Sequence, residues 1–268
     1  MNDVWDAPDL SGLVAVVTGA SRGVGRGIAD VLAECGARTY RAARTGADAC
    51  DVGDAASVDA LFERVRREEG HLEILVNNAV GWTSDSGEEG GAMPFLMEPP
   101  WRAPGWWWDS NFEVGVRSHY TVTNAAAALM TEGRRGIVIF TSERQPDEPG
   151  MQELVLDLRA TVVARMAFLY SLHLRPHRVS SVLLYPGFTR TESIQASFER
   201  RDPYFDGWTE ERYLTETGSM HFAGRAAAVL AAASLSGPIA RTGALITSVE
   251  LAREHGFTDI DGRRPDPI

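Results

Sequence analysis

A glycine-rich turn at residues 18–25 (Thr-Gly-Ala-Ser-Arg-Gly-Val-Gly) follows a short apolar run and opens an amphipathic segment. Glycine lets backbone N–H groups approach a ligand closely, and the N-terminus of a helix carries a partial positive charge. A turn of this kind between a strand and a helix suits the diphosphate of a dinucleotide. The residues predicted to form this cradle are Gly19, Ser21, Arg22, Gly23, Val24 and Gly25.

Four further short motifs lie along the chain. They are Asp51-Val52, Asn77-Asn78-Ala79, Thr141-Ser142, and Pro186-Gly187 with Thr191. The last three each follow an apolar run of strand length, so their roles depend on the elements that position them.

Those elements alternate between strands and helices. Apolar, β-branched runs predict strands at 13–18, 38–43, 72–76, 137–140, 179–184 and 244–249. Helical spacing of apolar residues predicts helices at 26–35, 54–69, 108–130, 154–174 and 222–235. The alternation predicts an α/β fold: one Rossmann-type, doubly wound parallel sheet with helices on both faces, in a single domain over residues 1–268. Two insertions, 81–107 and 191–217, are interpreted as binding loops or lids.

Composition excludes several classes of function. The net charge of −11 argues against a nucleic-acid or membrane-surface partner, since both need a basic face. Cys35 and Cys50 have no metal-ligand spacing and suit a reducing cytoplasm, so no metal site is predicted. The acidic start and the short apolar run at 226–240 predict neither a signal peptide nor a transmembrane span. All 26 basic residues are arginine, which excludes any mechanism that needs a lysine.

The glycine turn resembles the TGxxxGxG motif of the short-chain dehydrogenase/reductase family, and the later motifs extend the resemblance over roughly residues 10–250. The tail at 251–263 is similar to the branch of the family that contains dehydrogenase/reductase member 1. Residues 77–79 resemble the family's NNAG motif, with Val80 in place of the glycine. The cofactor contacts that the resemblance implies are Asp51 and Val52 at the adenine, Asn78 and Ala79, and Pro186, Gly187 and Thr191 near the nicotinamide.

The resemblance implies a nicotinamide cofactor, and the second strand indicates which one. That strand ends at Arg44 with no acidic residue to hold a ribose 2′-hydroxyl, whereas Arg22 and Arg44 could together face a 2′-phosphate. NADP is therefore expected in preference to NAD. Only residues 45–50 separate Arg44 from Asp51, too few for a parallel crossover with a helix. The adenosine end of the groove is then more open, which leaves weaker binding, or no cofactor, as alternatives.

The positions of the family's catalytic tyrosine and lysine carry other residues here. Counting forward from Ser142 places the tyrosine position at Val155 and the lysine position at Arg159. Counting back from Pro186 places them one residue later, at Leu156 and Ala160. The family's asparagine position falls on Gly115, and Asn111 is interpreted as lying one helical turn too early. Arg159 can keep a positive charge, but a guanidinium does not give up its proton in proteins, so it cannot act as an acid at neutral pH.

The serine position is retained as Ser142. Because the tyrosine position carries no tyrosine, a substitute proton donor is needed. Tyr185 is the tyrosine closest to the expected nicotinamide site, and Glu143 directly follows the serine. The other acid/base candidates are His119, Asp147, Glu148 and Glu153.

Three functions fit these features. The first is an NADP(H)-linked oxidoreductase that acts on a small apolar carbonyl or alcohol through Ser142 and a non-standard proton donor. The second is a non-redox enzyme on the same scaffold, such as a dehydratase, cyclase or isomerase, and the third is a catalytically silent nucleotide-binding protein. The helices at 108–130 and 154–174 resemble the family's oligomer interface, and the second is more apolar than one core face needs, so a homodimer or homotetramer is expected.

Overall fold

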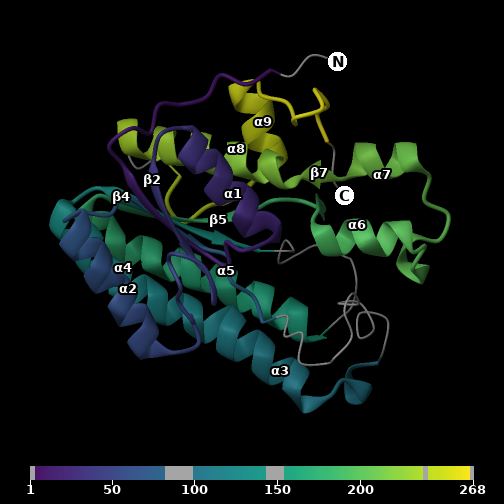
Figure 1. Cartoon of the computed structure of the whole chain (residues 1–268), viewed down its shortest axis with the longest axis horizontal. Coiled ribbons are helices and arrows are strands. Elements are labelled where there is room, and N and C mark those ends of the chain that lie inside the picture. Colours follow the sequence, from purple (N-terminus) through teal and green to yellow (C-terminus); the bar gives the residue numbers. More distant parts are fainter. Residues whose placement is uncertain (1–3, 82–98, 143–153, 238–240, 266–268) are drawn as a thin grey trace.

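The structure is a computed structural model that describes residues 4–81, 99–142, 154–237 and 241–265 (Figure 1). The described residues form a six-stranded parallel sheet in the order β2-β1-β3-β4-β5-β8. Its strands are β1 (Val14–Thr18), β2 (Arg38–Ala42), β3 (Ile74–Asn77), β4 (Gly136–Thr141), β5 (Val179–Tyr185) and β8 (Leu245–Thr247). The predicted doubly wound α/β sheet is confirmed.

Helices cover both faces of the sheet (Figure 1). One face packs against α1 (Gly23–Glu34), α8 (Met220–Ser236) and α9 (Ser248–His255). The other packs against α2 (Ala55–Glu68), α4 (Ser118–Gly133) and α5 (Leu154–Leu174). Alternate strand residues such as Val16 and Val17 enter opposite cores, which is why the strands are apolar throughout rather than alternating.

Two glycines fix the position of α1 against α8. A Cβ on Gly27 would lie 2.3 Å from the carbonyl oxygen of Met220, and a Cβ on Gly224 would lie 2.5 Å from the carbonyl oxygen of Gly27. The two helix backbones can approach this closely only because neither residue has a side chain. The contact sets the direction of α1 and so the place of its N-terminus.

The connection from β2 to α2 contains no helix, as the short spacing predicted. All of its residues are described, and they form one parallel bridge, between Ala43 and Ala49. Asp54 then caps α2 by accepting hydrogen bonds from two backbone N–H groups of the first turn. The sheet edge beside β2 is therefore bordered by a short loop.

The helix predicted at 108–130 is instead three continuous segments. α3 (Gly105–Phe112) passes through a π-helical turn (Glu113–Arg117) into α4. Of the insertion predicted at 81–107, residues 82–98 lie outside the described residues. Its last residues form a short 3-10 turn (Pro100–Arg102) and begin α3.

The last predicted strand, 244–249, is also shorter than expected. β8 ends at Thr247, whose side chain caps α9 and completes a capping box with Glu250. Val249 therefore lies in a helix. The T-x-x-E spacing that marks this helix start was readable in the sequence, but the apolar run around it favoured a strand.

The insertion predicted at 191–217 folds into helices rather than an irregular loop. It consists of α6 (Glu192–Glu199), a 3-10 turn (Pro203–Phe205) and α7 (Glu210–Glu216), between the short strands β6 (Thr189–Arg190) and β7 (Gly218–Ser219). We call residues 191–217 the helical insert. The insert and the nearby chain form an aromatic cluster separate from the two main cores: Phe198, Phe205 and Tyr213, with Phe188, Ile194, Tyr204, Trp208 and Leu214 around them.

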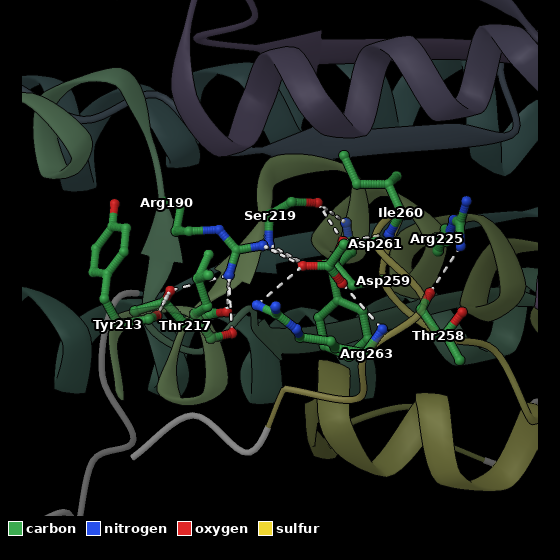
Figure 2. A network of polar contacts seen from close by, with 12 residues as sticks. Arg190, Tyr213, Thr217, Ser219, Arg225, Thr258, Asp259, Ile260, Asp261 and Arg263 are labelled. Carbon is green, nitrogen blue, oxygen red and sulfur yellow. Dashed lines mark hydrogen bonds and ion pairs between the residues drawn. The ribbon is translucent and has the colours of Figure 1, made fainter. Parts of the chain in front are cut away.

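A buried polar network fastens the base of the helical insert to the C-terminal segment (Figure 2). Arg190 Nη2 donates to Asp259 Oδ2 at 3.0 Å, while Nη1 donates to the carbonyl oxygens of Thr217 and Leu214. Asp259 also accepts from the backbone N–H of Ser219 at 2.8 Å. Both ends of the insert are therefore held by one fully buried carboxylate.

Candidate active site

The carboxyl ends of β1, β3 and β4 are joined by hydrogen bonds around Thr18. Its hydroxyl donates to the Val76 carbonyl at 3.2 Å and accepts from the backbone N–H of Asn78 (2.9 Å) and of Ala79 (3.1 Å). The Asn78 side-chain amide donates to the Thr18 carbonyl at 3.2 Å, and its Oδ1 accepts from the Thr141 hydroxyl at 3.3 Å. Three of the predicted motifs thus meet at one edge of the sheet.

Two glycines bring bare backbone to this edge. Gly19 has φ +65°, and a Cβ there would lie 2.9 Å from Ala79 Cα. A Cβ on Gly25 would lie 2.3 Å from Asn78 Nδ2 and 2.5 Å from the Gly19 carbonyl oxygen. Both positions therefore require glycine, because the turn packs directly against Asn78 and Ala79 at the end of β3.

The first turn of α1 is capped from a distance. Arg22, its N-cap residue, makes no side-chain cap hydrogen bond. The backbone N–H of Gly23 instead donates to Oε2 of Glu192 at 2.9 Å, and Glu192 Oε1 lies 3.7 Å from Arg26 Nη1. Sequence reasoning missed Glu192, because no local pattern shows that the first residue of α6 reaches α1, 169 residues earlier in the chain.

The residues of this cradle fit the diphosphate of a dinucleotide. Glycine backbone lines the turn, the positive end of α1 faces it, and a carboxylate already occupies the Gly23 N–H as a phosphate oxygen would. Ser21 and Arg22 are exposed, and Val24 is half-buried against the first core. The binding of a dinucleotide by these residues stays a prediction.

The opposite end of the cradle lies beside β2. The backbone N–H of Gly19 donates to the Ala42 carbonyl at 2.9 Å, which places the turn carrying Arg22 next to the strand that ends two residues before Arg44. Both arginines are exposed. The glycine turn and the end of β2 thus each carry an exposed arginine.

Asp51 and Val52 follow this edge. The Asp51 carboxylate accepts a hydrogen bond from the Gly53 N–H at 2.9 Å and is exposed, whereas Val52 packs against the second core. The contact predicted between these two residues and the adenine stays a prediction.

Ser142 and Tyr185 occupy corresponding positions at the ends of neighbouring strands. The register pairs Thr141 with Leu184, and the Ser142 N–H donates to the Leu184 carbonyl at 3.1 Å. Because both residues come one position after that pair, their side chains project to the same face. Their exposed fractions are 3% and 6%. The structure thus brings the predicted serine and tyrosine together.

The chain leaves β5 through Pro186 and Gly187, which has φ +82°. It then reaches Thr191, whose hydroxyl accepts from the Ile194 N–H and begins α6. A Cβ on Gly23 would lie 3.5 Å from Thr191 Cγ2, so this segment contacts the glycine turn. The motif after β5 therefore lies beside the glycine turn, and its contact with a cofactor stays a prediction.

Arg159 is buried beside the π-helical turn. It is 2% exposed, and its Nη1 donates to Asn111 Oδ1 at 2.6 Å. A Cβ on Gly115 would lie 2.6 Å from Arg159 Cδ, so a glycine in the π-turn makes room for the arginine. The sequence interpretation, which placed Asn111 one helical turn too early, did not foresee this contact. It depends on how α3 packs against α5, which carries Arg159.

His119, one turn further along, links α4 to the strand edge. Its Nε2 lies 3.0 Å from the Ala79 carbonyl oxygen, which can only accept, so Nε2 carries the proton. Burial, with a smaller effect from the positive charge of Arg159, lowers the pKa of His119 to about 4. The imidazole is therefore neutral at pH 7 and holds Ala79 in place rather than carrying charge.

The positions counted for the family's tyrosine lie in an apolar environment. Val155 and Leu156 pack with Trp107 in a small buried cluster. Ala160 is also buried, at 2% exposed. Glu143, which was predicted as a catalytic candidate, lies outside the described residues, as do the other three acidic candidates of the same segment.

Comparison with known proteins assigns the family. A model of the short chain dehydrogenase family matches residues 13–202. The chain is 31% identical over 281 residues to mouse dehydrogenase/reductase SDR family member 1, covering 95% of this chain and 85% of the mouse protein. Its identity to the human protein of the same name is 30%, with 96% and 86% covered. The chain therefore belongs to the short-chain dehydrogenase family, whose members are generally oxidoreductases that bind a nicotinamide cofactor.

Solved structures show the same fold. A short-chain type dehydrogenase/reductase from Mycobacterium marinum superposes with a TM-score of 0.71 at 23% identity, covering 89% of this chain and 94% of that one. A metagenomic short-chain oxidoreductase in complex with NADP gives a TM-score of 0.66 at 22% identity, covering 89% and 97%. None of the helices in the described parts of the chain is long and apolar enough to cross a membrane.

Proposed function

We propose that this protein is an NADP(H)-linked oxidoreductase that acts on a small apolar carbonyl or alcohol. The observation that carries the proposal is the glycine cradle, where Gly19 and Gly25 leave no room for side chains and Gly23 presents its N–H to an anion. Membership of the short-chain dehydrogenase family supports nicotinamide chemistry.

The preference for NADP over NAD rests on charge. Arg22 and Arg44 are both exposed, one in the glycine turn and one just after β2, and we infer that they meet a 2′-phosphate on the adenine ribose. Arginine binds phosphate with two parallel hydrogen bonds. The NADP found in a structurally similar oxidoreductase fits this preference.

The nicotinamide would supply or accept a hydride at the substrate carbon. Ser142 would hold the substrate oxygen by a hydrogen bond, and Tyr185, its neighbour across the strand ends, would transfer the proton that the oxygen gains or loses. Glu143 is the alternative proton donor. Arg159 keeps a permanent positive charge that Asn111 orients, without exchanging protons itself.

A non-redox reaction on the same scaffold is the second candidate. The packing of Val155 and Leu156 against Trp107 favours it, because an apolar cluster occupies the positions where the family's proton donor is counted. Proton transfer by Tyr185 or Glu143, without a hydride, would then suit a dehydratase or isomerase. Oxidation of NADPH during turnover separates the two candidates.

Titration with NADPH and then NADH, followed by energy transfer from tryptophan, tests the proposal. We expect NADPH to bind more tightly, and Arg44→Ala to weaken NADPH about tenfold while leaving NADH unchanged, because a hydrogen bond to a charged group contributes about 1.5–3 kcal/mol. Arg67→Ala, which removes an exposed arginine on α2, is the matched control and should change neither affinity. The absence of binding by either cofactor at millimolar concentration would exclude the redox function.

We also propose that α5 pairs with a second copy of the chain. One face of the helix carries exposed apolar residues: Leu154, Leu158, Val162, Leu169 and Leu172. An antiparallel pair with its twofold axis near Thr161 would bring Asp157 close to Arg165 of the partner subunit, so the charges on this face complement each other.

Sedimentation should show a dimer or tetramer that Leu169→Glu converts to monomer. Tyr120→Glu, on α4, is a probe of how far the interface extends, and a monomeric wild-type protein would refute the pairing.

A further inference from the structure

The Glu192 side chain occupies the positive end of α1 from outside the helix. Its Oε2 accepts from the Gly23 N–H at 2.9 Å, and its Oε1 lies 3.7 Å from Arg26 Nη1. The side chain is 46% exposed, so it is held by these contacts rather than by burial. Figure 1 shows α6, which carries it, beside the start of α1.

The first turn of α1 attracts a carboxylate for the same reason that it attracts a phosphate. Its N–H groups have no partner within the helix, and the aligned peptide dipoles add partial positive charge. Arg22 provides no side-chain cap, and Arg26 adds a full positive charge one turn further on. A diphosphate in the cradle needs the Gly23 N–H that Glu192 already uses, so the two anions exclude each other.

The position of α6 keeps Glu192 beside the glycine turn, while its side chain, which is 46% exposed, can leave the Gly23 N–H by rotating. Thr191 caps that helix and its methyl group faces Gly23, so residues 191 and 192 contact the glycine turn together. The rest of the helical insert packs around its own aromatic cluster, with Phe198 stacked on Tyr213 at 4.0 Å between ring centroids. Arg190, two residues before Glu192, fastens the base of the insert by its hydrogen bond to Asp259 in the C-terminal segment.

We propose that Glu192 is an internal competitor for the diphosphate site and that cofactor binding displaces its side chain from the Gly23 N–H. The proposal rests on the proposed dinucleotide-binding function. It makes Glu192 a determinant of cofactor affinity.

The experiment compares wild type, Glu192→Ala and Glu192→Gln in titrations with NADPH and, separately, with inorganic diphosphate. We expect Glu192→Ala to lower the Kd of both ligands about tenfold, within the range usual for coupled binding sites. Glu192→Gln should have a smaller effect in the same direction, because the amide keeps an acceptor oxygen but loses the charge. Glu199→Gln is the matched control, since it removes one negative charge from the other end of α6, where the Glu199 carboxylate accepts from the Gln195 side chain at 2.9 Å. It should stay within twofold of wild type.

Equal affinities in wild type and Glu192→Ala would overturn the proposal, and so would weaker binding by Glu192→Ala. If no variant binds NADPH or NADH but Glu192→Ala binds diphosphate more tightly, the competition stands and the dinucleotide function fails. If diphosphate also shows no difference, the competition fails. Amide exchange gives a second measurement: without ligand, the Gly23 N–H should exchange faster in Glu192→Ala, and an unchanged rate would mean that the carboxylate does not hold it.

Discussion

Replacing Asp259 with alanine is expected to lower the free energy of unfolding by about 3–5 kcal/mol, the usual effect of leaving one member of a buried ion pair without its partner. Asp259 is fully buried and accepts from Arg190 Nη2 and from the backbone N–H groups of Ser219 and Ile260. Without it, a guanidinium that is 13% exposed loses its buried anion. Thermal unfolding would record the loss as a fall in Tm of roughly 6–20 °C.

Asp261→Ala is the matched control for this variant. Asp261 lies 3.7 Å from the same Arg190 nitrogen, but it is 33% exposed, so water can replace it and the change should stay within about 1 kcal/mol. Limited proteolysis should then cut the helical insert faster in Asp259→Ala than in the control. If the two variants are equally stable, the network does not anchor the insert.

Replacing Gly25 with alanine is expected to weaken dinucleotide binding more than tenfold and to lower stability by about 1–3 kcal/mol, the usual effect of overpacking. The new Cβ would lie 2.5 Å from the Gly19 carbonyl oxygen and 2.3 Å from Asn78 Nδ2. The Asn78 amide is hydrogen-bonded to Thr18 and Thr141, and Gly19 is bonded to β2, so the turn has little freedom to give way. The overlap of the new Cβ must therefore be relieved by a shift of α1, which carries the N–H groups of the cradle.

Gly133→Ala separates this effect from a general response to adding a methyl group. Gly133 is the last residue of α4, and nothing lies within 4 Å of a Cβ there. Alanine is a better helix former, so we expect unchanged binding and unchanged or slightly higher stability. Wild-type affinity in Gly25→Ala would show that the cradle does not depend on the close contact between the turn and Asn78. The stability measurement remains informative whichever ligand the cradle binds.

The glycine turn and the motifs at the carboxyl ends of the strands could be predicted because the sequence patterns that mark them are local. The apolar run at β1 and the glycines at 19 and 25 reflect steric requirements within a few residues, and the motifs at 77–79, 141–142 and 186–187 each follow a buried strand. Parallel strands place their carboxyl ends at one edge, so order along the chain was enough to predict that these motifs meet. The absence of a helix between β2 and α2 could also be predicted, because the six residues 45–50 are too few for a parallel crossover that contains a helix.

Helix boundaries were less certain where two local preferences competed. The π-turn at Glu113–Arg117 has no sequence signal of its own, and its Gly115 leaves room for the Arg159 side chain from α5. Val249 was assigned to a strand because its neighbours are apolar, but the Thr247–Glu250 capping box decided in favour of a helix.

By itself, the sequence determined the α/β sheet, the glycine cradle and the residues that stand at the strand ends, since each depends on short-range sterics and on apolar patterning. The tertiary structure alone decided which polar side chains meet across the chain. Gly23 and Glu192 are 169 residues apart, Arg190 and Asp259 are 69 apart, and Asn111 and Arg159 are 48 apart. Such contacts depend on how whole helices pack, because the direction of a long side chain is set by every neighbour it touches and not by its own segment.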